Sequence, residues 1–558
     1  MRPTTLRALA VLASVALATG ACRRDGPDAV PSATPSPSTA TTQPELPPGA
    51  TELGGGSLRF ALGADPAAID PRFVADAEGR VVVDAVFDSL VRLGPDLRPR
   101  PAAALSWESN EDATEFTFSL DPGATFHDGS PVTAGDFVRA FDRIASGTAT
   151  PPSFLAHRLE AVAGFEEAQT TGVGLAGLSA PDPTTLVIRL RYPYAEFPEV
   201  LADPSLAPVP AVAEADPVGF GERPIGNGPF QLAEPWQHDQ FIRVARARPA
   251  AEGGPRLDEI VFPIYSADPA GEEQFADLEE GQLHVSEVPV SRTARAVEEF
   301  GLSDDGYRGP GLVDGLTTTV YYYGFNTEVP PFDDPDVRRA VAALIDRDRI
   351  VDTVTRGIRV VAEGVVPPSI PGAQEEPCPS CGYDPDRARE LLGDRELEPI
   401  RILHNRGRTH QGIAEAIARE MRAVGLEVEV SALDLQPYVQ TLRAGEMGMF
   451  RLGWEADHPS PGAYLHPLFG SEHVAGDNVT RFTDPEVDAL LAAARAEPDE
   501  DARNELYQEV ERRVLETAVV VPVFSYAHNR VVAPEVRDLV YDPFGTVDLS
   551  RVWLDETS

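Results

Sequence analysis

Two early segments of the chain have apolar residues at alternate positions, and this pattern predicts β-strands. The segments are 114–120 (TEFTFSL) and 184–192 (TTLVIRLRY), and in each the apolar side chains fall on one face. Between them, Thr133 precedes Asp136 by three residues, which predicts a capped helix start with apolar positions behind it. This part of the chain therefore mixes strands and helices.

The later part of the chain shows the pattern of a parallel sheet. Residues 400–403 predict a short strand, 411–424 an amphipathic helix and 426–430 a second strand. A strand, a helix and a strand in succession form a βαβ unit, so the two strands should be parallel. A further helix over 437–444 should lead to a strand over 449–452 in the same sheet. The predicted fold class is α/β.

Composition limits the possible partners. The chain has 558 residues, enough for two or three domains, and 42% of them are hydrophobic, as in a globular protein. Its formal net charge is −42 at pH 7. Such a surface repels nucleic acid and anionic lipid, so we expect neither as a partner.

The N-terminus has the layout of a secretory signal. Arg2 and Arg7 precede an apolar run over 8–18, which is too short to span a bilayer and ends in small residues before Cys22. The stretch TGAC resembles the lipobox of bacterial lipoproteins, with Thr19 where leucine is usual. The resemblance implies a signal peptide over 1–22 and a lipidated Cys22, whereas the alternative is a plain secreted protein with an accidental cysteine.

The segment 23–56 is rich in Pro, Ser and Thr and has almost nothing to bury, so it predicts a disordered tether. Two cysteines remain beyond it, Cys378 and Cys381. Outside the cytoplasm such a pair predicts a disulfide rather than a metal site. Proline and glycine flank the pair where a redox motif needs a strand and a helix, and zinc would need two further ligands that the neighbourhood lacks.

Charged and aromatic residues follow two of the predicted strands. In open α/β sheets, ligands bind beyond the carboxyl ends of the strands. Arg406 and Arg408 lie there, before the predicted helix over 411–424, and Trp454 and Asp457 follow the strand over 449–452. Arginine fits a carboxylate, an aspartate fits an ammonium, and a tryptophan face stacks on an apolar or cationic group. The set suits a zwitterion such as an amino acid or peptide, although such side chains could also be solvated or pair with nearby acids.

Several blocks of sequence resemble family 5 of the extracellular solute-binding proteins, the oligopeptide-, dipeptide- and nickel-binding proteins of ABC importers. The resemblance covers the chain from about residue 57 to its end. In chain order the blocks are LDPGATFHDGSPVTAGDFVRAFDR, IGNGPFQL, GFNTEVPPFDDPDVRRAVAALIDRDRIV and GWEAD.

The resemblance implies a two-lobed periplasmic-binding-protein-like fold of type II, with an extra subdomain and a hinge. Lobe one would take 57–320, with an inserted subdomain, and the C-terminal return 522–558, and lobe two would take 321–521. A solute would be buried between the lobes and delivered to a membrane permease whose partner ATPase hydrolyses ATP. The protein itself would need no cofactor, would act as a monomer, and would be held at the outer face of the cytoplasmic membrane by its lipid anchor alone.

The resemblance also implies roles for the charged residues. In peptide-binding members the aspartate of the GWEAD block holds the peptide amine, and Asp457 stands at that position beside Trp454. For the peptide carboxylate we prefer Arg408 to Arg406, because it lies closer to the helix start. Short peptides are the expected solute. A metal chelate of the nickel type or another small solute stays open, because three histidines lie near the predicted cleft: His404, His410 and His458.

Other classes of protein have less support. The chain has no G-x-S-x-G elbow, no H-E-x-x-H site and no Walker loop, and His127-Asp128 is better explained as a turn than as part of a triad. We therefore expect a binding protein and no enzyme, with a secreted hydrolase as the alternative. A cell-surface adhesion protein would need no charged cleft.

Overall fold

The computed structural model describes residues 55–555, apart from 267, 269, 270, 376, 379, 380 and 475. The described residues belong to one compact unit, Glu52–Ser558. The predicted signal peptide, the lipidation site Cys22 and nearly all of the predicted tether lie outside the described residues. No helix within the described residues is long and apolar enough to cross a membrane.

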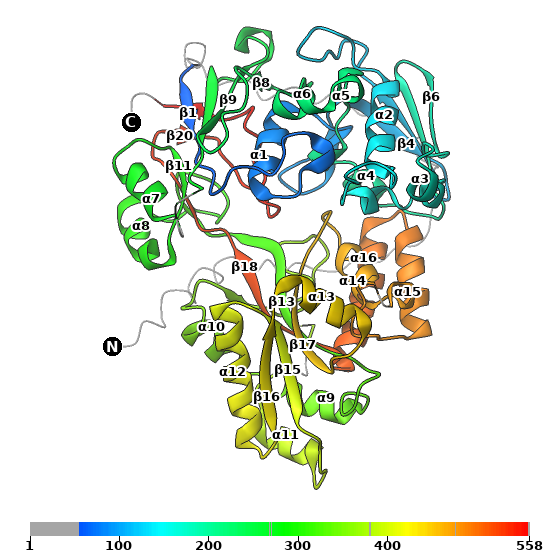
Figure 1. Cartoon of the computed structure of the whole chain (residues 1–558), viewed down its shortest axis with the longest axis vertical. Helices are drawn as coiled ribbons and strands as arrows, with labels where there is room; N and C mark the ends of the chain where they lie inside the picture. Colours follow the sequence, from blue (N-terminus) through cyan, green and yellow to red (C-terminus); the bar gives the residue numbers. More distant parts are fainter. Residues whose placement is uncertain are drawn as a thin grey trace, which may run out of the picture. The chain divides into compact units, whose positions relative to one another are not determined.

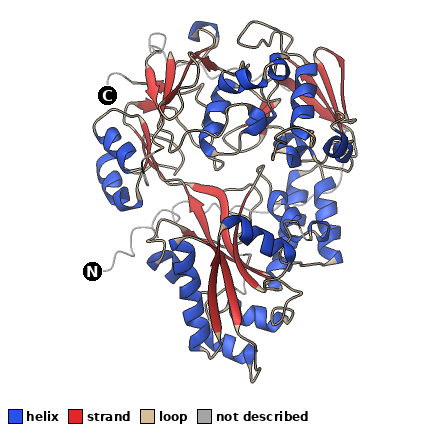
Figure 2. Cartoon of the chain, viewed as in Figure 1, coloured by secondary structure: helices blue, strands red, loops and turns tan. Residues whose placement is uncertain are grey.

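The chain enters the region of a six-stranded sheet once and leaves it once (Figures 1 and 2). We call residues 316–527, which contain this sheet, lobe 2, and the described residues on either side of them lobe 1. In order across the sheet, the strands are β14 (Val360–Val361), β18 (Val520–Ala527), β13 (Leu316–Phe325), β17 (Met449–Glu455), β15 (Ile400–Asn405) and β16 (Val428–Leu433). The helices of lobe 2 are α9 (Pro335–Ala342), α10 (Arg347–Thr353), α11 (Pro385–Leu392), α12 (Arg408–Ala423), α13 (Leu435–Ala444), α14 (Gly462–Phe469), α15 (Pro485–Ala496) and α16 (Glu500–Glu516).

Lobe 1 contains smaller sheets. Two have four strands, in the orders β1 (Ser57–Arg59), β10 (Glu259–Pro263), β9 (Phe241–Arg246), β8 (Phe230–Leu232) and β4 (Ala104–Ser109), β5 (Glu115–Leu120), β7 (Thr185–Arg189), β6 (Leu178–Asp182). The others are β11 (Val285–Glu287), β19 (Arg530–Val532), β12 (Gly311–Val313), then β2 (Val91–Leu93) with β3 (Pro99–Pro101), and β20 (Val536–Arg537) with β21 (Trp553–Leu554).

The helices of lobe 1 cover these sheets and join them. They are α1 (Ala77–Val86), α2 (Ala134–Ala145), α3 (Phe165–Thr171), α4 (Phe197–Val200), α5 (Val212–Ala215), α6 (Pro217–Glu222), α7 (Glu272–Glu279) and α8 (Thr293–Phe300). Each lobe has its own core. One cluster of buried apolar side chains draws on residues 58–313 and 531–552, and two others draw only on residues 320–524.

The first alternating segments form strands as predicted. β5 pairs with β7 in antiparallel register, with Phe118 opposite Leu186, so the apolar faces of both strands enter the core. The predicted helix cap is also present. The backbone N–H and the hydroxyl of Thr133 both donate to Oδ2 of Asp136, at 2.8 and 2.7 Å, and α2 begins directly after Thr133. Local hydrogen bonds therefore set the start of this helix.

The predicted βαβ unit is confirmed, but several predicted ends are wrong. β15 ends at Asn405 rather than 403, α12 ends at Ala423 rather than 424, and β16 spans Val428–Leu433 rather than 426–430. β15 and β16 are parallel, and β17 is parallel to β15. Helix α12 begins at Arg408 rather than at 411, because Gly407 already accepts the backbone hydrogen bond of Gln411 at 3.0 Å. β17 continues to Glu455 rather than ending at Leu452, because its backbone stays paired with β13. Such pairing depends on the neighbouring strand, which the pattern of apolar residues does not reveal.

Candidate functional site

A cavity of about 660 Å³ lies where the two lobes meet. Lobe 2 contributes Asp457 and His458, which follow β17, and the segment 368–371. Lobe 1 contributes most of the remaining lining, from α1, β2 and the C-terminal segment after β20. The volume falls within the range of known small-ligand sites.

Acidic side chains dominate the lining. Ten of the described residues that line the cavity are acidic: Asp84, Asp88, Asp96, Glu199, Asp203, Asp305, Asp457, Asp538, Asp542 and Asp548. Four are arginines: Arg80, Arg92, Arg308 and Arg551. The cavity therefore favours a ligand with positive charge.

Residues of two sequence blocks, IGNGPFQL and LDPGATFHDGSPVTAGDFVRAFDR, hold one side of the cavity in place. The side-chain oxygen of Asn227 accepts from the backbone N–H of Asp88 at 3.1 Å, and its amide donates to the carbonyl of Asp88 at 2.9 Å. A Cβ at Gly226 would lie 2.0 Å from the carbonyl oxygen of Val86, so this close approach requires glycine. The ring of His127 bridges the same loop, because Nδ1 accepts from the N–H of Gly226 at 3.2 Å.

We use the name acidic wall for Asp84, Asp88, Asp542 and Asp548. Asp88 and Asp548 share Arg92, at 3.5 and 3.7 Å. Burial, together with the charges of neighbouring aspartates, raises the pKa of Asp84 well above its usual range, and burial also raises the pKa of Asp88 and of Asp542. Asp542 is compensated by hydrogen bonds from Phe544 and Thr546, whereas Asp84 has no hydrogen bond to any described residue and is the least compensated carboxylate of the wall.

Asp457 faces lobe 1 from the other side and is bound to it. Nη2 of Arg158 donates to Oδ1 of Asp457 at 3.2 Å, and Nε2 of His157 lies 3.1 Å from Oδ2. Burial alone would raise the pKa of Asp457, but the hydrogen bond from His157 and the charge of Arg158 outweigh it and hold the pKa well below its usual range. The Asp457 side chain stays 40% exposed, so a further cation can still reach it.

Arg158 is one of the residues near this site that the sequence did not predict. It lies in the 3₁₀ turn Ala156–Leu159 of lobe 1, is only 7% exposed, and also pairs with Asp203. Arg158 and Asp457 are 299 residues apart in the chain. Nothing in their spacing or flanking residues indicates that they meet, so only the fold brings them together.

The other residues predicted for the site do not line this cavity. Nε1 of Trp454 donates to the carbonyl of Ala463 at 2.8 Å, and its half-buried ring packs on the core of lobe 2. Arg406 pairs with Asp434 at 2.6 Å. Arg408 is exposed, as the first residue of α12. A ligand role for these three residues stays a prediction.

The three histidines near the predicted cleft have separate surroundings. His404 is buried and hydrogen-bonded to Gln411, and His410 lies 3.0 Å from Arg451. His458 alone of the three lines the cavity, where its ring faces the hydroxyl of Tyr194 at 3.1 Å. The described residues contain no group of three or more His, Cys, Asp or Glu that could hold a metal ion.

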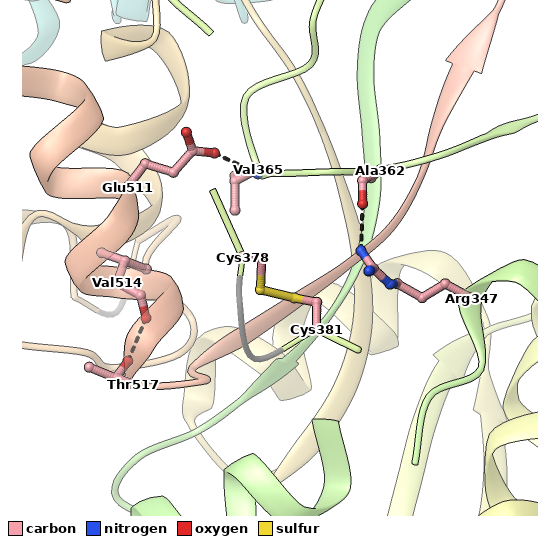
Figure 3. Close-up of a disulfide and its surroundings, with 8 residues drawn as sticks. All are labelled: Arg347, Ala362, Val365, Cys378, Cys381, Glu511, Val514 and Thr517. Atoms are coloured by element: carbon pink, nitrogen blue, oxygen red, sulfur yellow. Dashed lines mark hydrogen bonds between the residues drawn. A yellow bond between two sulfur atoms is a disulfide. The ribbon is translucent and has the colours of Figure 1, made fainter. Parts of the chain in front are cut away.

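Part of the lobe 2 side of the cavity comes from the long segment between β14 and α11, and Figure 3 shows part of this segment. Oε1 of Glu511 accepts from the backbone N–H groups of Val365 and Val366, at 2.8 and 3.0 Å. A disulfide joins Cys378 to Cys381. These contacts hold in place the segment whose residues 368–371 line the cavity.

A second contact between the lobes lies beside the cavity. Glu196 of lobe 1 is 2% exposed and accepts hydrogen bonds from Ser460 and, at 2.8 Å, from Tyr507 of lobe 2. Arg503 pairs with the same carboxylate at 3.2 Å. We call these four residues the Glu196 cluster. It places one fully partnered carboxylate between the lobes.

Comparison with known families gives one match over most of the chain. The profile described as "Bacterial extracellular solute-binding proteins, family 5 Middle" matches residues 98–476. The dipeptide-binding protein DppE of Bacillus subtilis is 26% identical over 513 residues, covering 88% of this chain and 90% of that protein. The periplasmic oligopeptide-binding protein OppA of Escherichia coli is 27% identical over 515 residues, covering 88% and 91%.

Solved structures share the fold. The clavulanic acid biosynthesis oligopeptide binding protein 2 superposes with a TM-score of 0.79 at 25% identity, covering 90% of this chain and 96% of that one. The unliganded open form of the murein tripeptide binding protein MppA gives a TM-score of 0.77 at 24% identity, covering 89% and 97%. These neighbours have the two-lobed fold that the sequence predicted.

Proposed function

Because the chain belongs to family 5 of the bacterial extracellular solute-binding proteins, we propose that it captures short peptides for an ABC importer. The relatives point to this class of solute, since their names include dipeptide-, oligopeptide- and murein peptide-binding proteins. Others are named for glutathione or deoxycholate, so the fold alone does not fix the solute.

The observation that carries the proposal is the position of Asp457. Its partly exposed carboxylate lines a cavity between the two lobes, at the position that the GWEAD motif predicts for an amine ligand. The pKa of Asp457 lies well below its usual range, so the group is ionised at neutral pH. An ammonium in the cavity would form a charge-assisted hydrogen bond with it.

Peptide titration tests this function. We expect a tripeptide with a free N-terminus to bind in calorimetry and to raise Tm, since a ligand at a hundredfold its Kd adds about 2.7 kcal/mol to stability. Asp457→Asn should weaken this peptide at least about tenfold, the factor that 1.4 kcal/mol represents. The same variant should barely change the weaker binding of the N-acetylated peptide, which has no ammonium.

Asp352→Asn is the matched control, because Asp352 is an exposed aspartate on α10 of lobe 2, away from the cavity. Its affinity should equal that of the wild type. Failure of every peptide to bind would overturn the proposed function. Equal binding by wild type and Asp457→Asn would reject the amine role of Asp457 and leave the family unaffected.

We further propose that the protein works outside the cytoplasm, held by a lipid on Cys22. The signal-like segment 1–22 and its final cysteine support this. Cys22→Ser should move the protein from the membrane fraction to the medium or periplasm. Mass spectrometry of the wild-type N-terminal fragment should find a lipid on Cys22, and an unmodified cysteine there would refute the anchor.

The last part of the proposal is that the bound peptide is delivered without chemical change. We propose that a monomer passes its peptide to the permease unchanged, because the site contains binding groups and the relatives are named as binding proteins. Peptides recovered after incubation should be intact by mass spectrometry. Cells that lack the protein should lose uptake of a labelled peptide, and uptake should return with the wild type.

A further inference from the structure

The acidic wall provides more negative charge than one peptide amine requires. Asp84 lies mostly buried in the wall and makes no hydrogen bond or ion pair with any described residue. Glu199, on α4, also lines the cavity, and its Oε2 atom is buried without a hydrogen-bond partner. The carboxylate of Asp84 and the Oε2 atom of Glu199 therefore lack hydrogen-bond partners among the described residues, in the same cavity as Asp457.

Buried charges without partners are costly, and proteins rarely keep them without a use. The acidity of the whole chain does not account for them, because exposed carboxylates confer solubility without entering a cavity. A metal ion does not fit them either, because no group of three or more such side chains among the described residues is close enough to hold one. A larger organic cation, which spreads its contacts, suits such a dispersed set.

We propose that the cavity selects peptides with a positively charged side chain, lysine or arginine, which the acidic wall and Glu199 bind while Asp457 binds the amine. The inference rests on the proposed function, because it concerns the same cavity and the same ligand. Arg92 forms ion pairs with Asp88 and Asp548, and its single charge also acts on Asp84, so one guanidinium faces three carboxylates of the wall. Close charge pairs that are shielded from water contribute enough to affinity to set such a preference.

The test compares matched tripeptides in calorimetry on the protein with Cys22→Ser. One series places lysine in turn at each of the three positions of trialanine, and a second series places norleucine at the same positions. Norleucine keeps the aliphatic chain of lysine and lacks its charge. We expect at least one lysine peptide to bind about tenfold more tightly than its norleucine counterpart, a difference of about 1.4 kcal/mol.

The variant Asp84→Asn/Glu199→Gln should reduce this preference to about threefold or less and leave the norleucine peptides unchanged. Asp112→Asn is the control in lobe 1, because Asp112 is exposed and does not line the cavity. Equal affinity for lysine and norleucine peptides at all three positions in the wild type would overturn the inference alone. Failure of every peptide to bind would instead overturn the proposed function.

Discussion

Buried carboxylates occur in two places where the lobes meet, and their surroundings are opposite. Glu196 accepts hydrogen bonds from Ser460 and Tyr507 and pairs with Arg503, so every part of its charge has a partner. In the acidic wall, Asp88 and Asp548 share the single guanidinium of Arg92. Asp84 has no hydrogen bond or ion pair with any described residue.

The difference distinguishes buried carboxylates that have a structural role from those that are available to a ligand. A partnered buried charge fixes the geometry of a contact, and losing one partner leaves the other charge uncompensated. A carboxylate without a partner weakens the free protein but is ready for a cation that arrives later. We infer that the Glu196 cluster joins the lobes and that the acidic wall serves the ligand.

Breaking the Glu196 cluster should have the largest effect on stability. Glu196→Ala leaves Arg503, which is itself buried, without its carboxylate, and it removes the shorter of the two hydrogen-bond partners of the Tyr507 hydroxyl. We expect a loss of about 3–5 kcal/mol in the free energy of unfolding, the usual result of removing one partner from a buried pair. Urea denaturation measures it.

Glu108→Ala is the control for this prediction, because Glu108 is exposed on β4 of lobe 1. Glu108→Ala should change the free energy of unfolding by no more than about 0.5 kcal/mol. A loss of less than about 1 kcal/mol in Glu196→Ala would show that the cluster does not hold the lobes together.

Removing a charge from the acidic wall should change the free energy of unfolding by less than Glu196→Ala does, and should raise it rather than lower it. Burial and neighbouring aspartates raise the pKa of Asp84 in the folded state, so the ionised form destabilises the fold. This penalty is absent below the pKa of an aspartate in the unfolded chain, about 3.9. It grows as the pH rises, until the pH passes the raised pKa of Asp84 in the folded state. Asp84→Asn should therefore raise the free energy of unfolding at pH 7.5, because the amide carries no charge to bury.

Urea denaturation of wild type and Asp84→Asn at pH 7.5 and at pH 4 tests the sign. The gain should appear at pH 7.5 and shrink at pH 4. A destabilised variant at pH 7.5 would mean that Asp84 has a favourable partner, and the contrast with Glu196 would fail.

Substitution of His157 should have the smallest effect on the free energy of unfolding. Its Nδ1 faces the carbonyl of Phe154 at 2.8 Å and its Nε2 faces Asp457, so both ring nitrogens meet acceptors and the charged form is favoured. Burial lowers the pKa of His157, but Asp457 outweighs it and the net shift is upward. The resulting stability is present below the unfolded pKa, about 6.5, and is lost as the pH rises through the folded pKa.

His157→Gln should therefore cost less than about 1 kcal/mol at pH 5.5 and nothing at pH 8.5, since the side chain is 50% exposed and solvent weakens the pair. Paired unfolding curves at the two pH values measure this. A loss of the same size at both values would assign His157 a packing role without its charge.

Local patterns predicted much of the fold. The cap at Thr133, the strands before and after it and the parallel pair β15–β16 were predicted from residues close together in sequence, whereas the antiparallel pairing of β5 with β7 was not. The predicted start of α12 and the predicted end of β17 were wrong, because the carbonyl of Gly407 accepts the N–H of Gln411 and because β17 stays paired with β13 as far as Glu455. Side-chain periodicity does not report such backbone contacts.

The site was less predictable than the fold. Asp457 was found through its motif, and it lines the cavity. Arg158 and the acidic wall were missed because their members come from distant segments: α1 supplies Asp84, and the chain after β20 supplies Asp542 and Asp548. Only folding brings these charges together, so no spacing in the sequence reveals them.

Native mass spectrometry of the protein with Cys22→Ser, purified from culture, tests the central claim most directly. Our account predicts a heterogeneous set of added masses that fragment as short peptides, enriched in lysine and arginine, and that are absent from the Asp457→Asn variant. A single discrete mass without peptide fragments, or a metal isotope pattern, would contradict the claim that this cavity captures peptides.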